Sequence, residues 1–237
     1  MKCLLTMFCY NEKGKIEKVL EKFSDYGIYD AAVMDDGSTD GSLADIGNFF
    51  PKVTVLKNSV NMGAGYSVRK VLYYARDKGY DAAIFVAGND KDNPNDVKKL
   101  IATMEEGFDF VQGSRYLPDG KYGNMPLHRT IGTKLIHPMI FSLFTGRKLT
   151  DTTNGFRAVK LSILEDKRIN LDQEWLDRYG LEPYLYYKAI VLGYRVKEVP
   201  VTKIYPEGQK KYTKMRPIVD WWSILKPLFY LKLGIKN

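Results

Sequence analysis

One short segment, residues 82–94, limits the folds open to this chain more than any other. Residues 82–87 are all apolar, which predicts a strand buried inside a sheet. The next six residues hold two carboxylates and two carboxamides, and Pro94 opens an amphipathic helix predicted over residues 95–106. In open α/β sheets ligands bind where strands end, so these oxygens could hold a cation against a phosphate. The alternative is a ligand-free turn, because Asn, Asp, Gly and Pro also supply turn geometry alone.

The same alternation of apolar strand and amphipathic helix runs through the first half of the chain. The pattern predicts further strands at residues 3–9, 30–34, 53–56 and 108–112, with helices from residues 11–12 to about 25 and over 64–78. Strands joined by helices of this length imply right-handed crossovers and parallel pairing. We therefore predict an α/β fold with a mostly parallel central sheet flanked by helices.

Composition narrows the class of partner without choosing one. The 237 residues are 45% hydrophobic, enough for one large domain with a full core. A formal charge of +8, from 36 basic and 28 acidic side chains, suits a nucleotide, a lipid phosphate or a membrane surface.

Cys3 and Cys9 are expected to be reduced core residues of a cytoplasmic protein. His128 and His137 lack a metal-ligand partner at useful spacing and are read as structural. No segment reaches the ~18 apolar residues of a membrane-spanning helix.

Two more predicted strand ends carry polar or glycine-rich loops. After the second strand comes Asp35-Asp36-Gly37-Ser38-Thr39-Asp40, where Asp35 can accept a hydrogen bond from a base N–H or a ribose hydroxyl. After the third comes Gly63-Ala64-Gly65 at a helix start, where backbone amides and the helix dipole favour a phosphate. Each pattern alone also fits a capped or tight turn.

Taken in order, these loops resemble a known enzyme family. Tyr10-Asn11-Glu12, residues 35–40 and Asn61-Met62-Gly63-Ala64-Gly65 resemble, in order and spacing, the family 2 inverting glycosyltransferases of the GT-A fold. Residues 113–116, 151–157 and 193–200 look like the branch of dolichyl-phosphate mannose synthase and polyprenyl-phosphate sugar transferases. The resemblance implies a GT-A domain over residues 1–216, with a donor half of about 1–115, an acceptor half of about 116–216 and an amphipathic tail over 217–237.

The resemblance also implies a nucleotide-sugar donor, a UDP- or GDP-sugar, lying across the ends of the first four strands. Glu12 and Asp35 would contact the ribose and the base, and Asp36 would help shape that pocket. Glycines after the third strand would leave room for the nucleotide. The expected donor-binding residues are Tyr10, Glu12, Asp35, Asp36, Gly63 and Gly65. No nucleic-acid partner is expected.

The sequence departs from the family pattern at the loop after the fourth strand. There the family carries an Asp-x-Asp triplet whose last Asp binds the Mg²⁺ or Mn²⁺ that bridges the diphosphate. If Pro94 matches the family's proline, the triplet here reads Ala87-Gly88-Asn89, which lacks both carboxylates. We expect Asp90 and Asp92 to hold the Mg²⁺ or Mn²⁺ instead, with Asn89 behind them. The alternatives are that Lys and Arg side chains neutralise the diphosphate, or that transfer activity is lost.

In the second half, the resemblance places Asp151 near the acceptor, where it would orient or deprotonate the attacking group. A phosphate acceptor is already ionised at neutral pH and needs little base catalysis, whereas a sugar hydroxyl would need a base. Arg115, Arg157 and Lys214 are the cations expected to stabilise the departing diphosphate.

Three further segments have two interpretations each. Residues 125–146 are predicted to be helical, with a kink at Pro138. Their stripe is interpreted as core, with lipid contact as the alternative; it comprises Leu127, Ile131, Leu135, Met139, Leu143 and Phe144. The basic segment 203–216 is a solvated loop or a cover over bound diphosphate. The tail lies in a membrane interface or packs on the domain. The resemblance implies polyprenyl phosphate as acceptor and a peripheral position on the cytoplasmic face of a membrane.

Two other classes of protein fit parts of the pattern. A sugar nucleotidyltransferase uses a similar sheet, but such enzymes show a Gly-rich loop with a basic residue where this chain has Tyr10-Asn11-Glu12. A catalytically impaired GT-A protein that still binds nucleotide sugars would explain the altered triplet. We predict an inverting glycosyltransferase, with these two classes as the alternatives.

Overall fold

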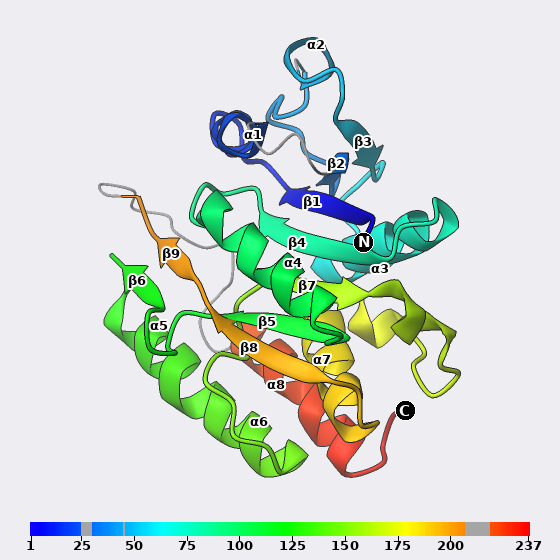
Figure 1. The fold of residues 1–237 in the computed structure, drawn as a ribbon, viewed down its shortest axis with the longest axis vertical. Helices are drawn as coiled ribbons and strands as arrows, with labels where there is room; N and C mark the ends of the chain where they lie inside the picture. The colour runs from blue at the N-terminus through cyan, green and yellow to red at the C-terminus, as the bar shows by residue number, and fades with distance from the viewer. Residues whose placement is uncertain (25–29, 45, 207–218) are drawn as a thin grey trace.

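The structure is a computed structural model, and it describes residues 1–24, 30–44, 46–206 and 219–237 (Figure 1). Within these residues the central sheet has the strand order β3-β2-β1-β4-β7-β5-β8. Its strands are β1 (Cys3–Cys9), β2 (Asp30–Asp35), β3 (Thr54–Lys57), β4 (Ala82–Ala87), β5 (Phe110–Ser114), β7 (Arg157–Lys160) and β8 (Val196–Pro200). Strand β7 runs antiparallel to its neighbours β4 and β5, and the other pairings are parallel. The predicted fold class is confirmed.

The carboxyl ends of β1, β2 and β4 lie level at one edge of the sheet. Cys9 pairs with Asp35, and Phe8 pairs with Ala87. The chain moves outward from β1 to β2 and β3, and then places β4 on the other side of β1. The loops after β1 and β4 therefore flank the point where the strand order reverses, which is where open α/β sheets bind ligands.

Apolar cores cover both faces of the sheet. On one face lie α1 (Ile16–Ser24), α2 (Ile46–Phe49), the short helix η1 (Pro94–Asp96) and α4 (Val97–Glu105). On the other face lie α3 (Ala64–Asp77), α6 (His137–Thr145), α7 (Leu181–Val191) and α8 (Val219–Lys232). Successive residues of β1 alternate between the two cores, with Leu4 in one and Leu5 in the other. Short helices η3 (Leu161–Glu165) and η4 (Glu174–Leu176) connect β7 to α7.

Element boundaries follow local backbone chemistry. The first strand has the predicted ends, but α1 begins at Ile16, later than the predicted residue 11 or 12. Asn11 and Gly14 have φ of 50° and 76°, which a right-handed helix cannot contain. The helix predicted from residue 95 instead begins with η1, whose cap Asn93 accepts a hydrogen bond from the Asn95 N–H at 3.1 Å.

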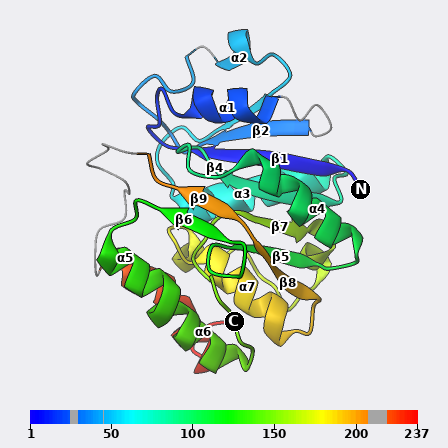
Figure 2. The same cartoon turned by 60° about the vertical axis from the view of Figure 1, so that its left-hand side comes forward.

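The predicted helix over 125–146 is built from three contiguous pieces. These are α5 (Leu127–Ile131), the π-helical turn η2 (Gly132–Ile136) and α6. Pro138 was expected to kink the helix, and the wider π-helical turn lies directly before the helix that contains it. Because proline lacks an N–H, it cannot close the usual hydrogen bond to residue 134, and a local change of helix type accommodates this. Figures 1 and 2 both show α5 and α6 along an outer edge of the molecule, beside the parallel pair β6 (Lys121–Gly123) and β9 (Thr202–Ile204).

The C-terminal helix α8 packs on the domain. Leu228 is buried in the core shared with α6 and α7, and the rings of Phe144 and Phe229 meet edge to face at 5.0 Å. A Cβ on Gly132 would lie 2.7 Å from the Trp221 ring, so glycine is needed where α8 crosses η2. These contacts favour packing for the tail helix. Among the described helices, none has the length and apolar character needed to cross a bilayer.

His137 makes stability depend on pH. The ring is buried on α6, with Nδ1 2.6 Å from Thr152 Oγ1, and burial lowers the pKa of His137 from 6.5 to about 4. Between these two pH values His137 is protonated in the unfolded chain and neutral in the folded protein. Stability that is present above pH 6.5 is therefore lost as the pH falls towards 4. The unfolding free energy should drop by about 2 kcal/mol between pH 7 and pH 5. His137→Gln should flatten this slope in urea unfolding curves, whereas exposed His128→Gln should keep it. An unchanged slope in His137→Gln would contradict this assignment.

Candidate active site

The loops after β1 and β2 are held together by hydrogen bonds. Ser38 Oγ accepts from the Asn11 N–H at 2.9 Å, and Asn11 Oδ1 accepts from the amide that follows Ser38 at 2.8 Å. Asp35, buried at the end of β2, accepts from the Ser38 N–H at 3.1 Å and from the Ser38 hydroxyl. The geometry of the two loops is therefore fixed by the protein itself.

Tyr10 and Glu12 lie on this fixed backbone. Tyr10 is partly exposed, and Glu12 pairs with Lys15 at 2.7 Å while its N–H donates to Ser42 Oγ at 3.0 Å. The structure thus brings Tyr10, Glu12 and Asp35 to the edge where β1 and β2 end. Their contact with a donor stays a prediction.

Asp36 organises the loop between β3 and α3. Its carboxylate is buried and accepts from Asn58 Nδ2 at 2.9 Å, Asn61 Nδ2 at 3.0 Å, the Met62 N–H at 2.9 Å and the Gly63 N–H at 2.9 Å. Four donors compensate its charge, which is why it can be buried without a cation. Asp36 supports the loop from within the protein.

The glycines at the start of α3 pack closely against the chain at residues 176–178. The Gly65 N–H donates to Arg178 O at 2.6 Å. A Cβ would lie 2.4 Å from Asp177 O on Gly63, and 1.9 Å from Leu176 O on Gly65. Both glycines are therefore required by the close approach of residues 176–178, and their contact with a nucleotide stays a prediction.

The loop after β4 directs its two carboxylates to lysines. Lys22 Nζ lies 2.5 Å from Asp90 Oδ1, and Lys203 Nζ lies 2.5 Å from Asp92 Oδ1. The other oxygen of Asp92 accepts from the Ala87 N–H at 3.1 Å. Asp92 and Lys203 are both buried, and they come from segments 111 residues apart.

These contacts do not fit a divalent metal. Lys22 belongs to α1 and Lys203 to β9, so the two carboxylates are drawn to different elements. Asn89 Oδ1 is buried without a hydrogen-bond partner, but a neutral oxygen alone holds Mg²⁺ or Mn²⁺ weakly. No group of three or more His, Cys, Asp or Glu in the described part of the chain could hold a metal. The predicted metal ligands Asp90, Asp92 and Asn89 are therefore not assembled as a metal site, because lysines already compensate both carboxylates.

Lys91 lies in the same loop and was not singled out from the sequence. Its Nζ lies 4.4 Å from the centroid of the Tyr205 ring, and Arg129 Cζ lies 5.7 Å from the same centroid. Burial, reinforced by the positive charges of Lys203 and Arg129, lowers the pKa of Lys91 to about 7. The only available signal was its position in the altered loop, since its neighbours come from distant segments.

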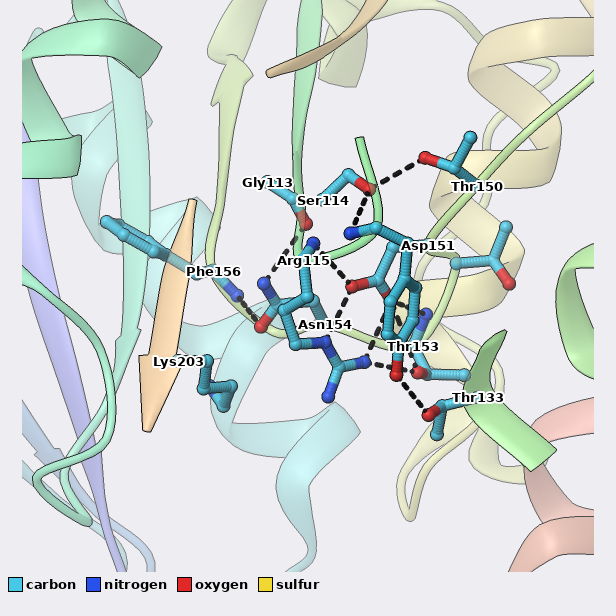
Figure 3. A network of polar contacts seen from close by, with 12 residues as sticks. Gly113, Ser114, Arg115, Thr133, Thr150, Asp151, Thr153, Asn154, Phe156 and Lys203 are labelled. Carbon is cyan, nitrogen blue, oxygen red and sulfur yellow. Dashed lines mark hydrogen bonds and ion pairs between the residues drawn. The ribbon is translucent and has the colours of Figure 1, made fainter. Parts of the chain in front are cut away.

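Arg115 and Asp151 form a buried, two-armed ion pair (Figure 3). Arg115 Nε lies 2.6 Å from Asp151 Oδ2 and Nη2 lies 2.8 Å from Oδ1, and the Arg115 N–H also donates to Oδ2 at 3.0 Å. Burial alone would lower the pKa of Arg115, but the Asp151 carboxylate raises it. Asp151 was predicted to orient or deprotonate the acceptor. Both of its oxygens are engaged by Arg115, and its role towards the acceptor stays a prediction.

Glu198 on β8 holds the backbone that presents this pair. It lies in the segment 193–200 that carries the family resemblance, but it was not predicted as a site residue. Its carboxylate accepts from the Thr150 N–H at 2.9 Å and from the Asp151 N–H at 2.8 Å. Thr150 Oγ1 donates a further bond at 3.0 Å. Burial raises the pKa of Glu198, although these bonds favour its charged form.

Arg157, at the start of β7, contacts the turn over residues 151–156 that precedes this strand. Its Nη2 donates to Asn154 O at 2.6 Å and lies 3.4 Å from Glu182 Oε1, and Asn154 Nδ2 donates to Gly113 O at 3.0 Å. These contacts direct the guanidinium to protein acceptors, so the expectation that Arg157 faces a departing diphosphate does not fit the structure. The fourth predicted catalytic residue, Lys214, lies outside the described residues.

A mostly apolar pocket opens beside the Arg115–Asp151 pair. It is lined by Arg129, Gly132, Thr133, Ile136, His137, Thr153, Trp221, Ile224 and Leu225. Thr153 Oγ1 also accepts from Arg115 Nη2 at 2.9 Å. One wall of the pocket is therefore continuous with the ion pair.

Next to this pocket, the apolar stripe of α5, η2 and α6 faces outward. The exposed fractions are 75% for Leu127, 60% for Leu135, 67% for Met139 and 75% for Leu143. Phe141, on the opposite side of α6, is buried. The interpretation of the stripe as core is wrong for these four exposed residues, whereas Phe144, the last residue of the stripe, packs against the core.

Comparison with known proteins identifies the family. The model of glycosyl transferase family 2 matches residues 5–167, and the chain belongs to this family of enzymes. The undecaprenyl-phosphate mannosyltransferase of Micrococcus luteus is 29% identical over 218 residues, covering 89% of this chain and 87% of the relative. The polyprenol monophosphomannose synthase of Mycolicibacterium smegmatis is 30% identical over 188 residues, which cover 77% of this chain and 69% of the relative. The predicted family and its polyprenyl-phosphate branch are confirmed.

A solved structure shares the fold. The glucosyl-3-phosphoglycerate synthase of Mycobacterium tuberculosis, in complex with Mn²⁺, UDP and glucosyl-3-phosphoglycerate, superimposes with a TM-score of 0.70 at 17% identity. The match covers 100% of this chain and 81% of that one. It establishes a common GT-A architecture.

The two neighbouring aspartates should respond differently to substitution. Asp36→Ala leaves four donors without their acceptor and should lower the unfolding free energy by about 2–4 kcal/mol. Asp35→Ala loses only the bonds from Ser38 and should cost about 1 kcal/mol, while UDP or GDP binding falls sharply. Urea unfolding and calorimetric titration measure the two quantities. Normal nucleotide affinity in Asp35→Ala would remove Asp35 from the donor site.

Glu198→Gln should displace the backbone of Thr150 and Asp151. The carboxamide turns an N–H donor towards amides that need an acceptor, so stability should fall by about 2 kcal/mol. Transfer activity should fall while nucleotide affinity stays, because the hydrogen bonds of the Glu198 carboxylate go to Thr150 and Asp151 in the loop before β7. The matched control is Glu106→Gln, whose exposed partner Lys197 lies next to Glu198 on β8. Equal effects of both substitutions on activity would contradict the positioning role.

Proposed function

We propose that this protein transfers a sugar from a nucleotide-diphosphate sugar to polyprenyl phosphate, with inversion at the anomeric carbon. The observation that carries the proposal is the apolar pocket that meets the Arg115–Asp151 pair at Thr153. An acceptor with a charged head and a hydrocarbon chain needs both surfaces side by side. The relatives from Micrococcus luteus and Mycolicibacterium smegmatis carry names that describe acceptors of this chemistry.

The charges around the pocket suit a phosphate head. Arg129 lines the pocket, and Arg115 lies behind Thr153. Asp151 compensates Arg115, whereas Arg129 both lines the pocket and acts on the Lys91 ammonium, so its charge lies between the acceptor head and the donor. The hydrocarbon chain would follow the apolar lining formed by Ile136 and the residues of α8.

The same arrangement accounts for a reaction without a general base. An oxygen of the acceptor phosphate attacks the anomeric carbon and forms a new C–O bond. The bond from that carbon to the donor diphosphate breaks on the opposite side, and its electron pair leaves with the nucleoside diphosphate. Because the acceptor oxygen is already ionised at neutral pH, no side chain has to remove a proton. This agrees with an Asp151 whose oxygens are occupied by Arg115.

The outward stripe supports a position at a lipid surface. Leu127, Leu135, Met139 and Leu143 form a contiguous apolar face beside the pocket, and soluble proteins rarely leave such faces uncovered. An amphipathic helix of this kind lies in the interface plane of a bilayer. A polyprenyl phosphate could then enter the pocket without leaving the membrane.

The proposal is tested by incubating the protein with UDP- and GDP-sugars and polyprenyl phosphate in vesicles of anionic phospholipid. We expect a lipid-linked sugar from at least one donor and none when the acceptor is a free sugar. Transfer to a free sugar but not to the lipid would overturn the acceptor assignment.

The triple variant Leu135→Ser, Met139→Ser, Leu143→Ser should separate membrane contact from chemistry. Transfer to the long polyprenyl phosphate in vesicles should fall about tenfold, because the apolar face contributes membrane affinity. Transfer to a short, water-soluble isoprenyl phosphate should persist. Phe49→Ser is the matched control, since Phe49 is 73% exposed on α2, on the other face of the sheet. An equal loss with both acceptors would contradict a membrane role for this face.

A further inference from the structure

We propose that Lys91, with Arg129 beside it, binds the diphosphate of the donor directly and takes the place of a divalent metal. This inference rests on the proposed function, since it requires a nucleotide-diphosphate donor. It concerns residues that the family pattern does not single out, and four features of the structure support it.

The first is the charge balance of the loop after β4. Asp90 is paired with Lys22 and Asp92 with Lys203, both at 2.5 Å. Lys91 adds a positive charge between them in the sequence. Both carboxylates of the loop are therefore already compensated by lysines, whereas a divalent cation requires carboxylate oxygens that can coordinate it.

The second is position. Lys91 stands two residues after Asn89, on the loop that leaves β4 where the strand order reverses. The charges of Glu12 in the β1 loop and of Arg129 on α5 both act on its ammonium group. Lys91 thus lies between the donor-side loops and the acceptor-side helix, where a diphosphate must sit during transfer.

The third is rigidity. Lys91 O accepts from the Ile204 N–H at 3.0 Å, and the Asn93 N–H donates to Thr202 O at 3.3 Å. These bonds join the loop to β9 on both sides of its bridge from Asp92. A cation on a fixed backbone needs little reorganisation when charge develops on a leaving group.

The fourth is the convergence of two cations. The Lys91 ammonium lies 4.4 Å and the Arg129 guanidinium 5.7 Å from the centroid of the buried Tyr205 ring, and the charge of Arg129 acts on Lys91. Neighbouring like charges repel, and an anion placed between them relieves that repulsion. A diphosphate carries several negative charges on closely spaced oxygens, and both side chains are phosphate binders.

In the reaction, the bond between the anomeric carbon and the β-phosphate oxygen breaks, and its electron pair stays on that oxygen. The negative diphosphate favours the protonated form of Lys91 and raises its pKa above the value of about 7 that burial gives it. The Lys91 ammonium and the Arg129 guanidinium then stabilise the new negative charge by hydrogen bonds. The nucleoside diphosphate leaves in its ionised form, and no metal takes part.

The inference is tested by calorimetric titration of the full chain with UDP and with GDP, in Mn²⁺ and in EDTA. At least one nucleotide should bind with the same affinity in both. Lys91→Met should weaken this binding about tenfold, the scale of a lost charge-assisted contact, and Lys91→Arg should restore most of it. The control Lys188→Met removes another lysine above a tyrosine, 5.7 Å from the Tyr184 ring centroid on α7, and should bind normally.

Three results overturn the inference while the proposed function stands. The first is nucleotide binding that requires Mn²⁺, and the second is normal nucleotide binding by Lys91→Met. The third is a Lys91→Met variant that loses affinity only for decyl phosphate, which serves as a probe of the acceptor head. Competition by pyrophosphate, which lacks base and ribose, should displace the nucleotide from the unmodified protein in EDTA. This arm and the Mn²⁺ comparison need no variant, so they decide the question even where Lys91→Met fails to fold. Absence of nucleotide binding in either condition, together with absence of transfer, overturns the inference and the proposed function alike.

Discussion

A charge taken out of water must be compensated, and this constraint shapes the whole edge of the sheet where the loops meet. Three of the buried carboxylates there are compensated by segments distant in the sequence. Asp36 draws in the loop before α3, Asp92 draws in β9, and Asp151 draws in the end of β5 through Arg115. These pairings join loops that the sheet alone would leave separate. Breaking one would leave its partner charged and buried, which costs more than the pair contributes.

The same constraint separates residues that hold the site together from those that remain for ligands. Three charged side chains form their hydrogen bonds with other residues of the protein: Asp36, Asp151 and Arg157. Tyr10 keeps partial exposure, and Lys91 and Arg129 bring two positive charges to one ring. The polar residues most visible in the sequence motifs are thus mainly the supports. The groups left to meet phosphate are less prominent in the pattern.

The fold was predictable where structure is set locally. Buried strands such as Cys3–Cys9 and Ala82–Ala87 are short apolar runs with polar ends, so their limits can be read from neighbouring residues. The motif loops after β1, β2 and β4 likewise lie at the edge of the sheet where the strand order reverses. The roles of individual residues could not be predicted, because their partners are remote. Residue 65 must be glycine because a Cβ there would collide with the carbonyl oxygen of Leu176, and Asp92 is compensated by Lys203. The exposed stripe was misread because periodicity locates an apolar face without saying whether anything covers it.

Strand β7 runs against its neighbours, and this reversal has a consequence for how such enzymes diversify. Because β7 is antiparallel, the chain enters it at the edge where β4 and β5 end, so the turn before it, residues 151–156, arrives beside the donor loops. One antiparallel strand thus places the turn over residues 151–156 beside the loops after β4 and β5. The parallel strands and their own loops keep their arrangement. Acceptor recognition can then change during evolution by remodelling one hairpin-like excursion and the helices attached to it. The nucleotide-binding scaffold would be inherited unaltered.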